Sequence, residues 1–327
     1  MTDRPTETSE RTGPDGSPHT TVEQTEGIVR TRSIRVAYEE FVPPPGGNPD
    51  SRPPIVLIMG FGAQLILWPT ELCEQLAAAG YRVIRYDNRD IGLSTKFEGM
   101  QVGGSFIARL LRSQLGLASE VPYTLHDMAA DARNFLDALR IERAHLVGAS
   151  MGGMITQLVA ATYPERVASA SIVFSSTNER FLPPPTPAAI RALLRPPPRN
   201  ATTEDLIEHS ARNFHMLGGP AFPREHDELR ELARTQIERS YYPQGMVRQL
   251  AAVLGSGSLR PYAARIQAPT TVIHGTNDPL LKPACGRAVA RAIPGSRLVM
   301  IDGMGHDLPT SVVPTLADEI LATIRTA

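Results

Sequence analysis

Residues 144–152 read Ala-His-Leu-Val-Gly-Ala-Ser-Met-Gly, and this stretch decides the fold. It starts as an apolar run, passes through a Gly-x-Ser-x-Gly pattern and leads directly into a helix-like segment. The pattern predicts a strand, a sharp turn at Ser150 and then a helix. Gly148 and Gly152 fit this prediction, because a side chain at either position would collide with a neighbouring strand or helix in so tight a bend.

Outside this stretch, apolar runs of strand length alternate with segments of helical periodicity. Continuous apolar runs are typical of strands that are buried on both faces of a parallel sheet. The alternation therefore predicts an α/β fold with a mostly parallel central sheet flanked by helices, preceded by an antiparallel strand pair. The predicted strands are 28–41 (a pair), 55–59, 81–86, 144–147, 168–174, 270–274 and 297–301, and the predicted helices include 70–79, 125–139, 283–292 and 312–324.

The rhythm of strands and helices breaks between about residues 177 and 263. That segment has no strand-like run, and two triple prolines bound its helix-like stretches, so we interpret it as a helical cap inserted over the sheet. The N-terminal residues are rich in Thr, Glu, Ser, Pro and Gly, a composition typical of disorder. The predicted organisation is a disordered tail (1–27), a core in two parts (28–176 and 264–327) and the cap (177–263).

Composition describes an ordinary globular enzyme of 327 residues with a formal net charge of −1. The net charge gives no electrostatic reason to expect binding to nucleic acid or to an anionic membrane. The longest apolar run, Ile55 to Phe61, is too short to span a bilayer, and no signal-peptide pattern precedes it, so the expected location is the cytoplasm. Cys73 and Cys285 lie far apart and suggest neither a disulfide framework nor a metal site.

A serine at such a turn becomes a nucleophile only if a base removes its proton and hydrogen-bond donors stabilise the oxyanion that forms. His306 is the predicted base, because it lies in a glycine-flanked loop after the last predicted strand. Asp278, in the loop after residues 270–274, is the predicted acid that would hold the other ring nitrogen. With Ser150, these residues follow the carboxyl ends of parallel strands, where side chains from different strands converge.

Other side chains are weaker candidates for these roles. Asp302 and Asp307 lie too near His306 in sequence to reach its far nitrogen easily. His145 falls within the strand before the turn and is interpreted as structural. The polar run at 87–94 is interpreted as a hydrogen-bond network around the nucleophile strand, because no histidine or cysteine ligand accompanies its carboxylates.

Two backbone amides are predicted to form an oxyanion hole. The N–H of Met151 follows the serine directly, and the N–H of Phe61 lies in the glycine-rich loop after the strand at 55–59. Gln64 and Trp68 follow that loop, and each is expected either to contact substrate or to pack in the interior.

These features make the chain resemble the α/β-hydrolase superfamily from about Ile28 to its C-terminus. The order of serine, aspartate and histidine and the insertion before the acid strand match that superfamily. Four stretches resemble, more narrowly, the esterase group that includes aclacinomycin methylesterase: Met59-Gly60-Phe61-Gly62, Trp68-Pro69, Arg85-Tyr86-Asp87-Asn88-Arg89-Asp90 and Gly303-Met304-Gly305-His306-Asp307-Leu308-Pro309.

The resemblance implies a catalytic triad of Ser150, Asp278 and His306, with Phe61 and Met151 as oxyanion donors. Two positions depart from the common superfamily pattern. Met59 stands where a histidine usually precedes the glycine, and Asp90 stands where a glycine usually follows the arginine. Both departures also occur in the methylesterase-like group and narrow the resemblance to it.

We therefore expect a carboxylesterase that cleaves small-molecule esters through an acyl-enzyme, without a metal or an organic cofactor. The alternatives are a hydrolase of C–C bonds, an esterase for one polyketide methyl ester, a cofactor-free perhydrolase side activity and a non-catalytic ligand-binding protein on the same scaffold. The apolar cap is expected to determine which substrates fit.

Overall fold

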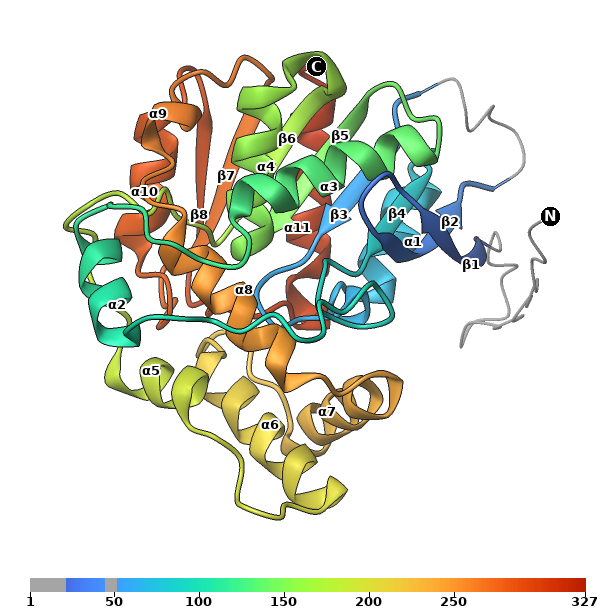
Figure 1. Cartoon of the computed structure of the whole chain (residues 1–327). Coiled ribbons are helices and arrows are strands. Elements are labelled where there is room, and N and C mark those ends of the chain that lie inside the picture. Colours follow the sequence, from blue (N-terminus) through green and yellow to red (C-terminus); the bar gives the residue numbers. More distant parts are fainter. Residues whose placement is uncertain (1–21, 45–51) are drawn as a thin grey trace.

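The computed structural model describes residues 22–44 and 52–327 of the chain. An eight-stranded sheet forms its centre, and helices cover both faces (Figure 1). The last six strands in spatial order run parallel, while the first two are antiparallel to their neighbours, which confirms the predicted mostly parallel sheet. The spatial order is β1 (Glu23–Arg30), β2 (Arg35–Val42), β4 (Val83–Tyr86), β3 (Ile55–Ile58), β5 (Ala144–Ala149), β6 (Val167–Val173), β7 (Thr270–Gly275) and β8 (Arg297–Ile301).

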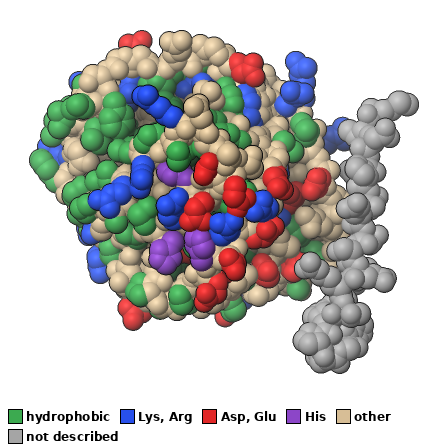
Figure 2. Space-filling view, turned by 90° about the horizontal axis from the view of Figure 1, so that it is seen from below, with side chains coloured by type: hydrophobic (Ala, Val, Ile, Leu, Met, Phe, Trp, Pro, Cys, Tyr) green, Lys and Arg blue, Asp and Glu red, His purple; other side chains and the backbone are tan. Residues whose placement is uncertain are grey.

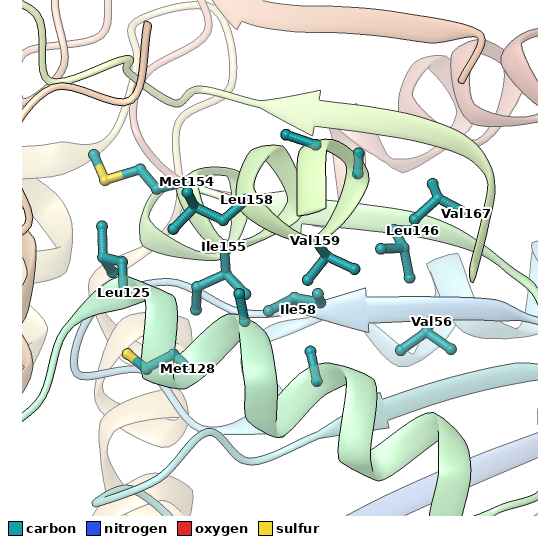
Figure 3. Close-up of a cluster of buried hydrophobic side chains, with 14 of the residues drawn as sticks. Val56, Ile58, Leu125, Met128, Leu146, Met154, Ile155, Leu158, Val159 and Val167 are labelled. Atoms are coloured by element: carbon teal, nitrogen blue, oxygen red, sulfur yellow. The ribbon is translucent and has the colours of Figure 1, made fainter. Parts of the chain in front are cut away.

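The sheet separates two apolar layers. Alternate residues of a strand point to opposite faces, so Val56 and Ile58 of β3 pack into one cluster while Ile55 and Leu57 pack into the other. The first cluster lies between the sheet and the helices α3 (Leu125–Ala138) and α4 (Met151–Thr162), as Figure 3 shows. The second is covered by α1 (Thr70–Ala78) and α11 (Val313–Ile324). Burial on both faces explains why the central strands read as continuous apolar runs.

The predicted cap range contains five helices. Three of them, α5 to α7, project beyond the carboxyl edge of the sheet, at the bottom of Figure 1. The short α9 packs instead against α4 and α10 (Pro283–Ala292), so the chain has already rejoined the core before residue 263. The five helices are α5 (Pro187–Leu194), α6 (Thr203–Leu217), α7 (His226–Arg239), α8 (Pro243–Gly255) and α9 (Arg260–Ala263).

Two elements differ from the sequence predictions. The first strand begins at Glu23, so part of the range 1–27 belongs to the sheet, while residues 1–21 lie outside the described residues. As an edge strand, β1 pairs antiparallel with β2 along its whole length, which agrees with the predicted strand pair from residue 28 onward. None of its side chains is fully buried, and its polar first half, residues 23–27, was assigned to the tail. The helix α2 (Phe106–Gln114) was not predicted.

Both cysteines are buried thiols outside any disulfide. Burial raises the pKa of Cys73 to about 12 and that of Cys285 to about 11, so both remain protonated at neutral pH. No helix within the described ranges is both long and apolar enough to cross a membrane.

The fold predicts the effect of a methyl group at Gly152. A Cβ there would collide with the backbone carbonyl of Ile58, which cannot move without disturbing the sheet. We expect Gly152→Ala to lower the free energy of unfolding by about 3 kcal/mol or more, measured by urea denaturation. Gly103→Ala is the matched control, because a Cβ at Gly103 meets nothing within 4 Å; equal stabilities of the two variants would contradict this packing.

Candidate active site

Ser150 occupies a strained turn between β5 and α4. Its backbone has φ 55° and ψ −118°, a region that residues with a side chain rarely adopt. The Ser150 N–H donates to the carbonyl of Val173 at 2.9 Å, which ties the turn to β6. Cβ atoms at Gly148 or Gly152 would collide with neighbouring backbone atoms, as the sequence analysis expected. The turn therefore lifts the serine side chain clear of the carboxyl edge of the sheet.

The loop after β8 brings His306 to this serine. The Nε2 atom of His306 lies 3.0 Å from Ser150 Oγ, and Nδ1 lies 2.7 Å from Asp278 Oδ2. The backbone N–H of His306 donates to the carbonyl of Leu217 in the cap at 2.8 Å. The ring also packs on Phe174, with 4.5 Å between ring centroids. The structure thus brings together the three side chains selected from the sequence.

Asp278 is held in place by four neighbours. Its side chain is fully buried, and its Oδ1 accepts hydrogen bonds from the N–H groups of Leu280 and Leu281, both at 2.8 Å. Its Oδ2 faces His306, and His274 Nε2 lies 3.4 Å from the same oxygen. These contacts fix the plane of the carboxylate opposite Nδ1 of His306.

His274 is a neighbour that sequence reasoning missed. It lies within β7, is fully buried and donates from Nε2 to the carbonyl of Leu281 at 2.7 Å. Burial lowers its pKa, although nearby Asp278 acts in the opposite direction. The ring is therefore neutral at pH 7. It supports the loop that carries Asp278 through its hydrogen bond to Leu281 and forms no ion pair with the Asp278 carboxylate. Its position directly before the Gly275 to Pro279 loop was the only available signal.

The two candidate oxyanion amides lie on either side of the serine. Met151 is the first residue of α4, so its N–H has no acceptor within the helix. Within the described ranges, the N–H of Phe61 has no hydrogen-bond partner. A Cβ built at Gly60 would lie 3.0 Å from Ser150 Cβ, so this loop passes directly beside the serine. The neighbouring Gly62 N–H donates to Gln249 Oε1 of α8 at 2.9 Å.

Gln64 and Trp68 have different surroundings. Gln64 lines the cavity above Ser150, but its amide nitrogen donates to the carbonyls of Gln236 and Ser240 at 2.6 and 2.9 Å, so it anchors the cap. Trp68 is fully buried in the core and does not line the cavity. Of the two roles expected for Trp68, packing is therefore the one the structure shows, and substrate contact was wrong.

The polar run at 87–94 joins the core to the cap. Asp87 Oδ2 lies 2.7 Å from Arg239, and Asp90 accepts two hydrogen bonds of 2.8 Å from Arg248. Asp90 also accepts from the Tyr123 hydroxyl at 2.8 Å. Every carboxylate of the run is thus occupied by a donor. No group of His, Cys, Asp and Glu in the described part of the chain is arranged to hold a metal ion.

A cavity of about 270 Å³ lies between Ser150 and the cap. Its walls are largely apolar and rich in aromatic rings, and the polar groups that converge on it are few. Such a lining favours an apolar organic ligand whose orientation is fixed by a small number of polar contacts. Among the lining residues are Phe61, Phe174, Phe214, Leu217, Ile237 and Met246.

Three comparisons place this arrangement among known proteins. Residues 53–309 match the family described as the alpha/beta hydrolase fold. The chain belongs to this family. It is 31% identical to rhodomycin D methylesterase DauP of Streptomyces sp. (strain C5), over 84% of this chain and 91% of that protein. It is also 27% identical to a 2-hydroxy-6-oxononadienedioate/2-hydroxy-6-oxononatrienedioate hydrolase of Paraburkholderia xenovorans (strain LB400), over 77% of this chain and 80% of that protein.

Solved structures show the same fold. The enol-lactonase from Burkholderia xenovorans LB400 superposes with a TM-score of 0.65 at 21% identity, covering 91% of this chain and all of that chain (100%). A hydrolase from Pseudomonas aeruginosa PA01 superposes with a TM-score of 0.66 at 25% identity, covering 92% and 98%. The protein is therefore an α/β-fold hydrolase with methylesterase relatives, and the resemblance to the methylesterase group is confirmed.

Asp307, beside His306, lines the cavity and gives a pH prediction. Burial raises the pKa of its carboxyl from 3.8 to about 6. The folded state therefore binds this proton more tightly than the unfolded state, and stability is lost as the pH rises from about 4 to about 6. We expect Asp307→Asn to be more stable than the parent by about 1–3 kcal/mol at pH 8 and equally stable at pH 3.5.

Chemical denaturation at the two pH values measures this difference. Asp318→Asn, at an exposed position on α11, is the matched control and should leave stability within about 0.5 kcal/mol at both values. A stability gain for Asp307→Asn that is the same at pH 3.5 and pH 8 would show that the carboxyl is not strained by burial.

Proposed function

We propose that the protein is a carboxylesterase that uses Ser150 as nucleophile, His306 as general base and acid, and Asp278 as the acid that orients the imidazole. One observation carries this proposal: a continuous pair of contacts, 3.0 Å from serine to histidine and 2.7 Å from histidine to aspartate. Both lengths suit proton transfer and imidazole orientation. The methylesterase relatives, at 30–31% identity, support an ester as the bond that is cleaved.

The reaction proceeds in two halves. His306 Nε2 accepts the serine proton as Oγ attacks the ester carbonyl, while Asp278 stabilises the imidazolium and holds its tautomer. The amides of Phe61 and Met151 donate to the oxygen that becomes negative. His306 then protonates the leaving alcohol, and an acyl-enzyme remains on Ser150. Water, deprotonated by the same imidazole, attacks the acyl carbonyl. The bond from the acyl carbon to Oγ then breaks, His306 returns the proton to Ser150 Oγ, and the acid is released.

The cavity supports a small-molecule ester with a large apolar portion. The wall around Ser150 is built from the Phe61 loop and from the α6, α7 and α8 side of the cap, and its aromatic rings offer faces for a flat or branched hydrocarbon group. Side chains and water supply every step of the mechanism, so the proposal needs no metal or organic cofactor.

Ser150→Ala tests the nucleophile. We expect turnover of p-nitrophenyl esters to fall by about 10³- to 10⁶-fold, with far-ultraviolet circular dichroism unchanged, because the only side-chain hydrogen bond of Ser150 among the described residues is the one with His306. Labelling by a fluorophosphonate probe should disappear at the same time. Ser296→Ala, at the amino end of β8, is the matched control and should keep both activity and labelling.

The substrate panel also tests the competing functions. Esters of increasing acyl length, bulky aromatic methyl esters and activated diketones are compared at equal enzyme concentration. Turnover of diketones without ester turnover would replace this proposal with C–C bond hydrolysis, one of the alternative reactions expected from the sequence. If the folded protein neither turns over esters nor is labelled at Ser150, the proposal of an esterase is replaced by that of a ligand-binding protein.

Gln249 is predicted to be a positioning residue for the oxyanion loop. Its Oε1 accepts from Gly62 N–H at 2.9 Å and its Nε2 donates to the Arg89 carbonyl at 2.8 Å, so it joins α8 to the loop that carries Phe61. We expect Gln249→Ala to lower kcat about 10- to 100-fold with little change in KM, because a displaced amide no longer meets the oxyanion.

Gln244→Ala provides the matched control, since Gln244 is exposed on the same helix. It should leave kcat unchanged. If Gln249→Ala raised KM alone, Gln249 would act in substrate binding instead of positioning the loop.

A further inference from the structure

Exposed apolar side chains gather on one part of the surface. Ten of the fifteen large hydrophobic side chains that are exposed in the described chain come from two segments, residues 100–117 and 180–200. Figure 2 shows apolar side chains gathered at the left of the cap-side face, where α2 and α5 lie in Figure 1. We call these two segments the α2–α5 surface, and its exposed apolar residues are Met100, Phe106, Ile107, Leu110, Leu111, Leu115, Leu117, Phe181, Ile190 and Leu194.

The helix α2 presents its apolar side to solvent. Ile107 and Leu111 are 68% and 61% exposed, whereas Arg109 is buried and donates to the carbonyl of Gly103 at 2.6 Å. A helix that packs on a protein core shows the opposite pattern. The structure therefore leaves an apolar face of α2 without a partner in the described chain.

The two segments are neighbours in space. The N–H of Phe181 donates to the carbonyl of Gln114 at the end of α2. Beyond this contact the chain continues into α5, where Ile190 and Leu194 are exposed while Ala192 and Leu193 line the cavity above Ser150. The same helix therefore separates the α2–α5 surface from the candidate active site.

The charge of the α2–α5 surface indicates which kind of partner it binds. The two segments contain six arginines and no Lys, Asp or Glu, although the whole chain has a net charge of −1. Five of these arginines are exposed. Apolar side chains surrounded by cations match the headgroup region of an anionic bilayer. A second copy of the same surface would oppose arginine to arginine, which disfavours self-association. The six are Arg109, Arg112, Arg180, Arg191, Arg195 and Arg199.

We propose that the α2–α5 surface binds the surface of anionic lipid bilayers, with the apolar side chains of α2 and α5 entering the headgroup region and the arginines contacting lipid phosphates. The overall charge gave no reason to expect a membrane partner, because a local concentration of arginine is offset by acidic residues elsewhere. Binding in this orientation places α5, which lines the cavity with Ala192 and Leu193, against the lipid.

Vesicle co-sedimentation of the full chain tests this proposal. The probe is a vesicle of phosphatidylcholine with about 30 mol% phosphatidylserine, compared with phosphatidylcholine alone. We expect the parent protein to bind the anionic vesicles at least tenfold more strongly than the neutral ones, and to be released when salt rises from about 0.1 M to about 0.5 M. Absence of binding to the anionic vesicles would overturn the proposal.

Two variants locate the binding surface. The double variant Ile107→Glu, Leu111→Glu should reduce binding at least tenfold, because it puts carboxylates on the face that meets the lipid. Ile28→Glu, at a 57% exposed position on the distant edge strand β1, is the matched control and should bind as the parent does. Hydrolysis of a soluble ester in the absence of vesicles, unchanged in both variants, shows that each is folded. Equal binding of the double variant and the parent would overturn the proposal.

Self-association is the remaining outcome. If light scattering finds a dimer of the parent that dissociates in the Ile107→Glu, Leu111→Glu variant, the surface is an interface between copies and the lipid proposal is wrong. A monomer that binds anionic vesicles through this surface supports the proposal.

Discussion

The close approach of the first turn of α4 to β3 is the constraint on which the site depends. Gly152 lies so near the Ile58 carbonyl that no side chain fits between them, and this contact holds Ser150 in its strained conformation. The same contact places the loop after β3, with Gly60 and the Phe61 amide, directly beside the serine. One steric limit therefore positions the proposed nucleophile and one of its proposed oxyanion donors together.

A second constraint is the left-handed backbone conformation of Asp90, which is held by hydrogen bonds to its side chain. Asp90 has φ 67° at the position where the superfamily usually has glycine, the residue for which this conformation carries no steric penalty. Its carboxylate accepts from Arg248, from the Tyr123 hydroxyl and from the Phe97 N–H. The hydrogen bonds of its carboxylate offset the energetic cost of its strained backbone. The hydrogen bond with Arg248 also attaches α8 to this loop. Truncation of either Asp90 or Arg248 would leave the charge of the other residue unpaired in the interior.

The sequence was most informative where burial and local turns act together. The central strands were recognised because both of their faces are buried, and Ser150 and Asp278 were selected because each follows such a strand. His306 was selected because its glycine-flanked loop follows the last strand, β8, which lies at the edge of the sheet. The polar first half of the edge strand β1 was not predicted, because none of its side chains is fully buried and it has no apolar alternation. The helix α2 was also not predicted, and its apolar residues face solvent and not the core. Gln249 was missed for another reason: its contacts join segments far apart in the chain, and no local motif marks such a residue.

The hydrogen bond between Gln249 and Gly62 has a consequence for how this architecture diversifies. The helix α8 directly holds the backbone of the loop beside Ser150, so the segment that contains α8 is not an independent module that can be exchanged freely. Transplanting the corresponding segment from another hydrolase would introduce a new pocket lining. It would also remove the hydrogen bond from Gly62 N–H to Gln249 that holds the loop beside Ser150. Recombination at these boundaries therefore requires a glutamine, or an equivalent acceptor, to be transferred with the new helix.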